Sequence, residues 1–183
     1  MKPIFMVVGP PAVGKSTTSR ALAAHFPKSI HISVDDLRTM VISGLALPSA
    51  VWTDELTQQI TLARQTVVHM ALSYSSAGFA VVIDDFWDAN HPVDYAGLLS
   101  QAQSVLGKIV LYPSQVEAHQ RNLKRSGDTP ARSYIDDGIR IVYQQLQPVI
   151  AQLKEQGWLI LDTTAMSVET AVESILEQTS VGQ

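Results

Sequence analysis

The chain has 183 residues, of which 46% are hydrophobic and 16% charged, and its formal net charge is −4. This composition is typical of one compact globular domain and argues against a disordered chain. The acidic balance disfavours broad nucleic-acid binding, which needs clustered Lys and Arg. The absence of cysteine excludes disulfides, thiolate metal sites and cysteine nucleophiles, and it is compatible with the cytoplasmic location that we expect.

Short apolar runs recur along the chain. The first, residues 4–8, is too short for a signal peptide, and no later stretch is long enough for a membrane helix. Residues 80–83, 108–112 and 158–161 are likewise apolar on both faces, and residues 30–34 form a weaker fifth run. Runs of this kind are typical of strands in a parallel sheet that helices cover on both sides.

Helical patterns separate the apolar runs. Because strands and helices alternate, we predict an α/β fold whose ligands bind at the carboxyl ends of the strands. The predicted helices cover residues 15–25, 35–44, 53–76, 93–106, 114–126, 133–156 and 167–178.

Residues 9–17, GPPAVGKST, match the P-loop pattern in full, with a strand before them and a helix after. Such a loop curls its backbone amides around phosphates, and glycine permits the angles this needs. Lys15 would reach the β- and γ-phosphates, and Ser16 would bind magnesium. The predicted nucleotide contacts are Gly9, Pro11, Ala12, Val13, Gly14, Lys15, Ser16 and Thr17.

Two acids, Asp35 and Asp36, follow the second apolar run. A carboxylate there could take the proton from an attacking hydroxyl, and Asp35 is our first candidate for this general base. The alternative is that both acids cap a helix. Arg38, one turn further on, is predicted to bind an anionic group of an acceptor or to be a solvated surface residue.

Asp84 and Asp85 end the most apolar run, as in a Walker B motif. We assign Asp84 to magnesium and Asp85 to the acceptor, although the order of these two roles stays open. The alternative is a capping role for both. Trp87 could stack on a substrate ring, or it could pack under a loop.

Basic residues of 121–132 predict a lid over the nucleotide, at about residues 121–137. Arg121 and Arg125 lie four residues apart on one helix face and could neutralise a transferring phosphoryl group. Arg20 and Arg64 are interpreted as structural or surface residues. The five histidines show no metal-ligand spacing.

Five segments together resemble the small P-loop kinases related to adenylate and shikimate kinase, especially the chloramphenicol phosphotransferase-like, polynucleotide kinase-like and zeta-toxin groups. The segments are GPPAVGKST, SVDDLR (33–38), VVIDDFW (81–87), YPSQVEAHQRNLKRSGD (112–128) and LDTT (161–164). The resemblance implies a three-layer P-loop fold with a five-stranded parallel sheet, helices on both faces and a small helical lid. It covers nearly the whole chain, which we therefore treat as one domain.

The resemblance also implies ATP and Mg²⁺ as cofactors and transfer of the γ-phosphate to a hydroxyl. Lys15, Asp35 and Arg125 match the family's catalytic positions, with Arg121 as the alternative lid arginine. Arg38 matches an acceptor-binding arginine of polynucleotide kinases. We expect a small-molecule acceptor and no membrane partner. The alternatives are a polynucleotide 5′-hydroxyl kinase and a nucleotide-binding switch without an acceptor.

Overall fold

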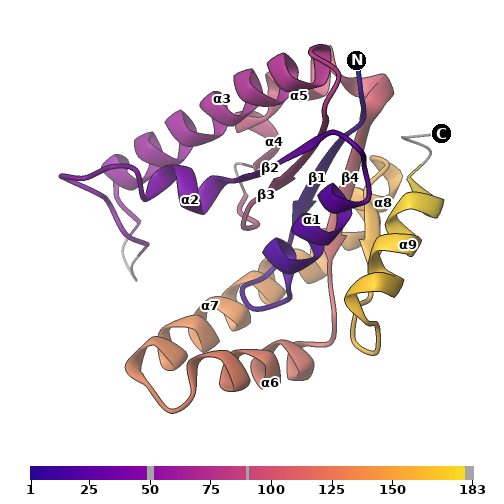
Figure 1. Cartoon of the computed structure of the whole chain (residues 1–183). Coiled ribbons are helices and arrows are strands. Elements are labelled where there is room, and N and C mark those ends of the chain that lie inside the picture. Colours follow the sequence, from indigo (N-terminus) through magenta and orange to yellow (C-terminus); the bar gives the residue numbers. More distant parts are fainter. Residues whose placement is uncertain (49–51, 90, 180–183) are drawn as a thin grey trace.

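The computed structural model describes residues 1–48, 52–89 and 91–179. Its centre is an all-parallel sheet in the order β2-β3-β1-β4-β5 (Figure 1). The five-stranded parallel sheet expected from the sequence is therefore confirmed. The strands are β1 (Ile4–Val8), β2 (Ser29–Ser33), β3 (Ala80–Asp84), β4 (Leu106–Leu111) and β5 (Leu159–Leu161).

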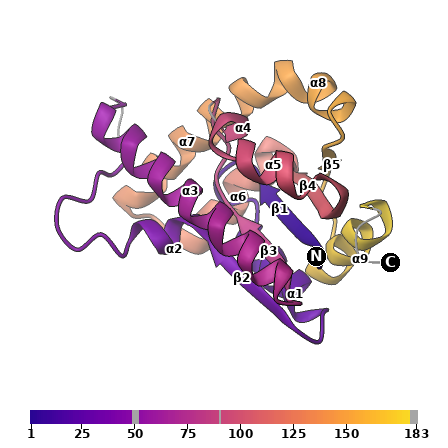
Figure 2. The same ribbon diagram turned by 90° about the horizontal axis from the view of Figure 1, so that it is seen from above.

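Helices surround the sheet, as the view from above shows (Figure 2). No helix in the described ranges is long and apolar enough to span a bilayer. The helices are α1 (Lys15–Ala24), α2 (Val34–Arg38), α3 (Asp54–Ser76), α4 (His91–Asp94), α5 (Ala96–Gln101), α6 (Gln115–Ser126), α7 (Pro130–Leu146), α8 (Ile150–Glu155) and α9 (Val168–Gln178), with 3-10 turns at Gln103–Val105 and Gln147–Val149.

The central strand β1 has a hydrophobic core on each of its faces. Ile4, Met6 and Val8 pack into one core with residues of α3, α5 and α8. Phe5 and Val7 point the other way, into a second core built with α1 and α9. Successive side chains of a strand alternate between faces, so a strand between two helical layers must be apolar throughout. This is why residues 4–8 contain no polar residue.

Helix starts follow the capping rules. The Thr53 hydroxyl accepts a hydrogen bond from the Leu56 amide at 3.1 Å and begins α3. The Ser33 and Ser114 hydroxyls do the same for α2 and α6, each at 3.2 Å. Such caps satisfy amides that have no partner inside the helix. The turn after β2 therefore fixes where Asp35 and Asp36 stand.

Three predicted helices are shorter or divided in the structure. The helix expected over 35–44 ends at Arg38, and the amides of Met40 and Val41 then make tighter turn bonds to the carbonyls of Leu37 and Arg38. Further along, Ala46 is held by Arg38 Nη2 and by Gln59 Oε1 at 2.9 Å each. The helix expected over 133–156 begins at Pro130 and breaks around Pro148, which has no amide hydrogen for the helix ladder. The helix expected over 93–106 divides into α4, α5 and a 3-10 turn.

A buried ion cluster surrounds Arg64 of α3, whose side chain is 0% exposed. The guanidinium contacts Asp85 at 2.6 Å, Asp88 at 2.5 Å and Asp94 at 2.7 Å. Burial acts to lower the pKa of Arg64, but these carboxylates outweigh it and raise the pKa. Arg64 is thus a structural residue that ties α3 to the chain between β3 and α5.

We predict that Arg64→Met destabilises the protein by about 3–5 kcal/mol, because it leaves buried carboxylates without their cation. The free energy of unfolding in urea measures this loss. Arg20→Met, an exposed arginine of α1, is the matched control and should change stability by less than about 0.5 kcal/mol. Equal effects of the two substitutions would contradict the role given to the cluster.

Candidate active site

The P-loop lies between β1 and α1, at the carboxyl edge of the sheet (Figure 1). Ala12 and Gly14 adopt positive φ angles of 61° and 95°. Alternation of such residues with ordinary ones turns successive amides inward and makes an anion nest. Gly9 has a φ of 149°, and a Cβ there would lie 2.5 Å from the carbonyl oxygen of Leu111. The loop geometry thus requires glycine at position 9.

Lys15 is the centre of charge in this loop. Its ammonium donates a hydrogen bond to the Pro10 carbonyl at 2.8 Å. Burial lowers the pKa of Lys15, while the nearby carboxylates of Asp35, Asp84 and Asp85 act to raise it and Arg125 acts to lower it. Charges from α2, α6 and the end of β3 therefore all affect the pKa of this one ammonium.

Asp35 stands in the first turn of α2, with 69% of its side chain exposed. Desolvation by the surrounding protein and the charge of Asp85 raise the pKa of Asp35, against the opposing effect of Lys15 and Arg38. Its exposed carboxylate is open to an incoming molecule. The neighbouring Asp36 is also exposed, and the amide of Asp36 belongs to the cap of α2.

Arg38 is buried, which differs from the solvated surface position considered for it. Its Nη2 donates to the Ala46 carbonyl at 2.9 Å, and its Nη1 lies 3.5 Å from Asp35 Oδ1. The side chain thus holds the segment after α2 and contacts the candidate base. This placement supports a positioning role and corrects the expectation of a solvated surface arginine, while the anion contact expected for Arg38 stays a prediction.

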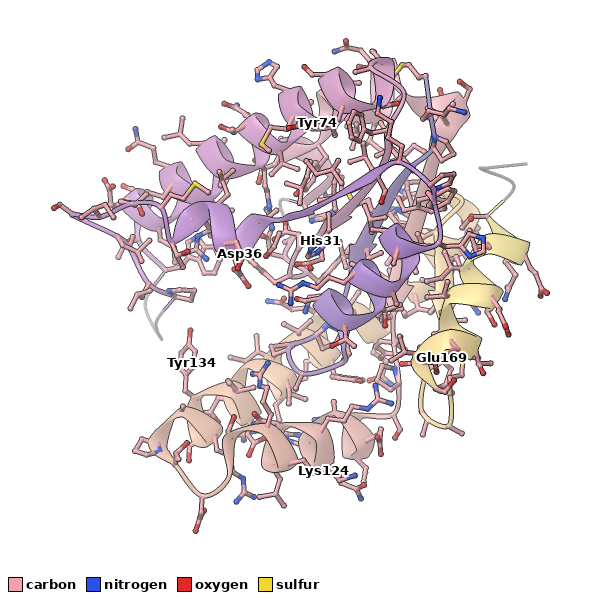
Figure 3. All side chains as sticks on the ribbon, in the orientation of Figure 1. His31, Asp36, Tyr74, Lys124, Tyr134 and Glu169 are labelled. Atoms are coloured by element: carbon pink, nitrogen blue, oxygen red, sulfur yellow. The ribbon has the colours of Figure 1, made fainter. Side chains whose placement is uncertain are left out.

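Asp84 ends β3 and is almost fully buried. Its Oδ2 lies 2.6 Å from Nε2 of His31 on the edge strand β2, and His31 is labelled in Figure 3. Within the described residues no three His, Cys, Asp or Glu side chains are grouped to hold a metal by themselves. Ser16, exposed in the first turn of α1, and Asp84 fit a magnesium that is bound mainly by phosphates and water.

Asp85 and Trp87 do not face an acceptor. The Asp85 carboxylate bonds to Arg64, to the Tyr95 hydroxyl at 3.2 Å and to the Phe86 amide at 2.8 Å. Burial acts to raise the pKa of Asp85, but His91 and Arg64 outweigh it and lower the pKa. Trp87 is 6% exposed and stacks on His91. The acceptor contacts predicted for both residues are corrected: they anchor the chain after β3.

Helices α6 and α7 form a hairpin at the position predicted for the lid (Figure 1). Buried Asn122 joins them through the Arg132 carbonyl at 3.1 Å and Asp136 at 2.9 Å. His119 lies 2.7 Å from the same Asp136 carboxylate. These contacts hold the two helices together beside the P-loop.

The two lid arginines have different surroundings. Arg121 donates to the Val13 carbonyl at 2.9 Å, to the Thr163 carbonyl at 2.7 Å and to Glu117 at 2.8 Å. It therefore fastens α6 to the P-loop and to the end of β5. Arg125, one turn further on, is exposed, and its charge reaches Lys15. Arg125 is the arginine that stays available for a ligand.

Tyr134 of α7 adds a contact that the sequence did not suggest. Its hydroxyl donates to the Pro48 carbonyl at 2.9 Å, and Figure 3 shows it standing out from α7 toward the segment after α2. Burial and the charge of Asp35 raise the pKa of Tyr134, while Arg38 acts to lower it. This tyrosine thus joins α7, in the predicted lid, to the segment after α2. A lone Tyr between polar helix residues carries no sequence signal for such a role.

His31 was also missed as a partner of Asp84. A signal for it exists in the sheet register, since Ser33 pairs with Asp84 and His31 lies two residues before Ser33. Diagonal neighbours on adjacent strands come within reach of long side chains. The contact requires the strand order to be known, which the sequence patterns alone did not give.

The P-loop, the strand order and the helical hairpin define the structural class of small P-loop kinases. Solved structures similar to this chain include the tunicamycin resistance protein of Deinococcus radiodurans, with 18% identity, a TM-score of 0.67, and 99% of this chain and 97% of that chain covered. A shikimate kinase from Acinetobacter baumannii in complex with shikimate has 16% identity and a TM-score of 0.65, with 97% and 92% covered. A gluconokinase from Sinorhizobium meliloti has 18% identity and a TM-score of 0.61, with 97% and 91% covered.

The chain belongs to the family described as AAA domain, whose model matches residues 4–140. A comparison with curated protein sequences found no significant match. The resemblance to small P-loop kinases that the five segments indicated is confirmed by the fold.

We predict that Arg121→Met lowers the free energy of unfolding by about 1–3 kcal/mol, because it removes hydrogen bonds between α6, the P-loop and β5. Arg125→Met should change it by less than about 0.5 kcal/mol, since that side chain is exposed. Urea unfolding of both variants is the measurement. A stability loss in Arg125→Met as large as that in Arg121→Met would contradict the conclusion that Arg121 is structural and Arg125 is available for a ligand.

Proposed function

We propose that the protein is an ATP-dependent phosphotransferase that moves the γ-phosphate to a hydroxyl of a small molecule. One observation carries this proposal: Asp35 has an exposed carboxylate, and the charges of Asp35 and of Lys15 in a complete P-loop each affect the pKa of the other. A P-loop alone needs only to bind phosphate. An accessible carboxylate beside its lysine supplies the group that an attacking hydroxyl requires.

Each residue of the site has a role in the proposal. The loop amides and Lys15 hold the phosphates of ATP, and the Asp35 carboxylate accepts the hydroxyl proton. Arg125 approaches the transferring phosphoryl group from α6. Magnesium, held by Ser16 and by Asp84 through water, would neutralise charge on the phosphates. His31 keeps the Asp84 carboxylate oriented through their 2.6 Å contact.

The comparisons support this class of reaction. Two similar structures are a shikimate kinase with shikimate and a gluconokinase, both named for small-molecule acceptors. The alternative of a polynucleotide 5′-hydroxyl kinase depended on Arg38 as an anion contact. Since Arg38 is buried and bound to the protein, that alternative has less support.

A switch protein without an acceptor is the remaining alternative. It would bind nucleotide and need no base beside the phosphates. The raised pKa and the exposure of Asp35 favour a proton-accepting role instead. A screen of hydroxyl compounds with ATP and Mg²⁺, read as ADP release above background, separates the two.

We predict that Asp35→Asn keeps ATP binding within about twofold but lowers the rate of phosphoryl transfer by about 10²–10⁴-fold, the usual contribution of a general base. Asp36→Asn, a change of the adjacent exposed acid, is the matched control and should retain most activity. ADP release with a responsive acceptor and titration with an ATP analogue give the two readouts. Full transfer activity in Asp35→Asn would remove Asp35 from the mechanism.

The pH profile gives an independent check. A general base must be deprotonated, so kcat/KM should fall about tenfold per pH unit as pH drops below the pKa of Asp35. Because that pKa is raised, the fall should begin above the ordinary aspartate value of about 3.9. Rates measured from pH 4 to 8 test this, provided that circular dichroism shows the protein to be folded throughout. A flat profile down to pH 4 would contradict it.

A further inference from the structure

We infer that the acceptor is an uncharged hydroxyl compound with an apolar body, which lies against the segment between α2 and α3. This inference rests on the proposed function and narrows its substrate class. We call residues 40–48 together with Trp52 the acceptor segment; residues 49–51 lie outside the described ranges.

The acceptor segment exposes several large apolar side chains. Ile42 is 93% exposed, Met40 and Leu47 are 69% each, and Trp52 is 48%. Single exposed apolar residues are ordinary, but several in one short segment indicate a binding surface. The segment thus offers an apolar contact area beside α2.

The segment is joined to the candidate base by its own hydrogen bonds. Arg38 contacts Asp35 and donates to the Ala46 carbonyl. Gln59 of α3 accepts from the Ala46 amide and donates to the Gly44 carbonyl at 2.8 Å. Tyr134 reaches the Pro48 carbonyl from the lid. A molecule whose hydroxyl meets Asp35 therefore has this segment within reach.

A hollow of about 180 Å³ lies between α2 and α3 at the root of the segment. Its lining is mainly apolar, with Leu37, Val41 and Leu62 among its residues, and it includes Arg38. Arg38 is 7% exposed, and its Nε has no hydrogen-bond partner in the described structure. A buried donor without a partner is costly, so the Nε of Arg38 marks a place where an oxygen atom of a ligand would accept a hydrogen bond.

The charges near the segment do not suit an anionic acceptor. Residues 39–53 contain no Asp, Glu, Lys, Arg or His. Arg38 is occupied by Ala46 and Asp35, and Arg121 by Val13, Thr163 and Glu117. The remaining cations of the site are Lys15 and Arg125, which the proposed function assigns to the phosphates of ATP. An acceptor with a carboxylate or phosphate would lie beside Asp35 and Asp36, whose charges repel it, and the positive charge of Arg38 is already paired with Asp35.

The test uses the unequal exposure of the tryptophans. Trp87 and Trp158 are each 6% exposed, so acrylamide quenching of fluorescence reports mainly Trp52. The full chain, with a non-hydrolysable ATP analogue and Mg²⁺, is titrated with methyl β-D-glucoside and with octyl β-D-glucoside below its micelle concentration. These probes carry the same hydroxyls and differ only in apolar length. Shikimate and gluconate are the anionic probes.

We expect octyl glucoside to protect Trp52 from acrylamide at concentrations at least ~100-fold below those needed for methyl glucoside, because seven further methylenes can be buried. Shikimate and gluconate should give no protection. The double variant Ile42→Ser with Leu47→Ser should weaken protection by octyl glucoside about tenfold or more. Val93→Ser, at a residue of α4 that is 74% exposed, is the matched control and should leave it unchanged.

Several results would overturn the inference while leaving the proposed function intact. These are equal protection by the two glucosides, protection by the anionic probes, or unchanged affinity in the double variant. A wild-type dimer that the double variant abolishes in sedimentation would assign the segment to a second copy of the chain. A failure of the proposed function would instead appear in the transfer assay of Asp35→Asn, whose readout does not depend on Trp52.

Discussion

A single buried guanidinium holds together the part of the chain on which the site is built. Arg64 pairs with Asp85, Asp88 and Asp94, and so fixes the chain that follows β3. That chain in turn bonds to the P-loop strand, through the Asp85 amide to Val7 at 3.1 Å and the Trp87 amide to Gly9 at 3.4 Å. The phosphate loop is therefore supported from α3 through the chain that follows β3.

The donor half of the site could be predicted from the sequence because its chemistry is local. Gly9, Gly14, Lys15 and Ser16 lie in one short loop whose backbone shape their own residue types require. The five strands were also predictable, since a strand covered on both faces must be apolar at every position. Asp35 could be named because it directly follows such a strand.

The rest depends on contacts between distant residues. Arg64 finds its carboxylates 21 to 30 residues further along the chain, and no local pattern distinguishes it from a solvated helix arginine. The same holds for Arg38, whose partner Ala46 lies in the segment after α2, and for Arg121, whose carbonyl partners lie in the P-loop and after β5. Burial of a charged residue is decided by what the tertiary fold brings to it, so these three arginines could be interpreted only once the fold was known.

The bond between Tyr134 and Pro48 joins α7 to the segment after α2. It is one neutral hydrogen bond at an exposed position, with a net strength of about 1 kcal/mol. We expect such a bond to break and re-form at the rate of loop motions, within microseconds, which is fast compared with typical enzyme turnover. For the proposed acceptor, entry between these two elements would then not limit the rate of turnover, and the time for which a compound stays bound would depend on its contacts in the site.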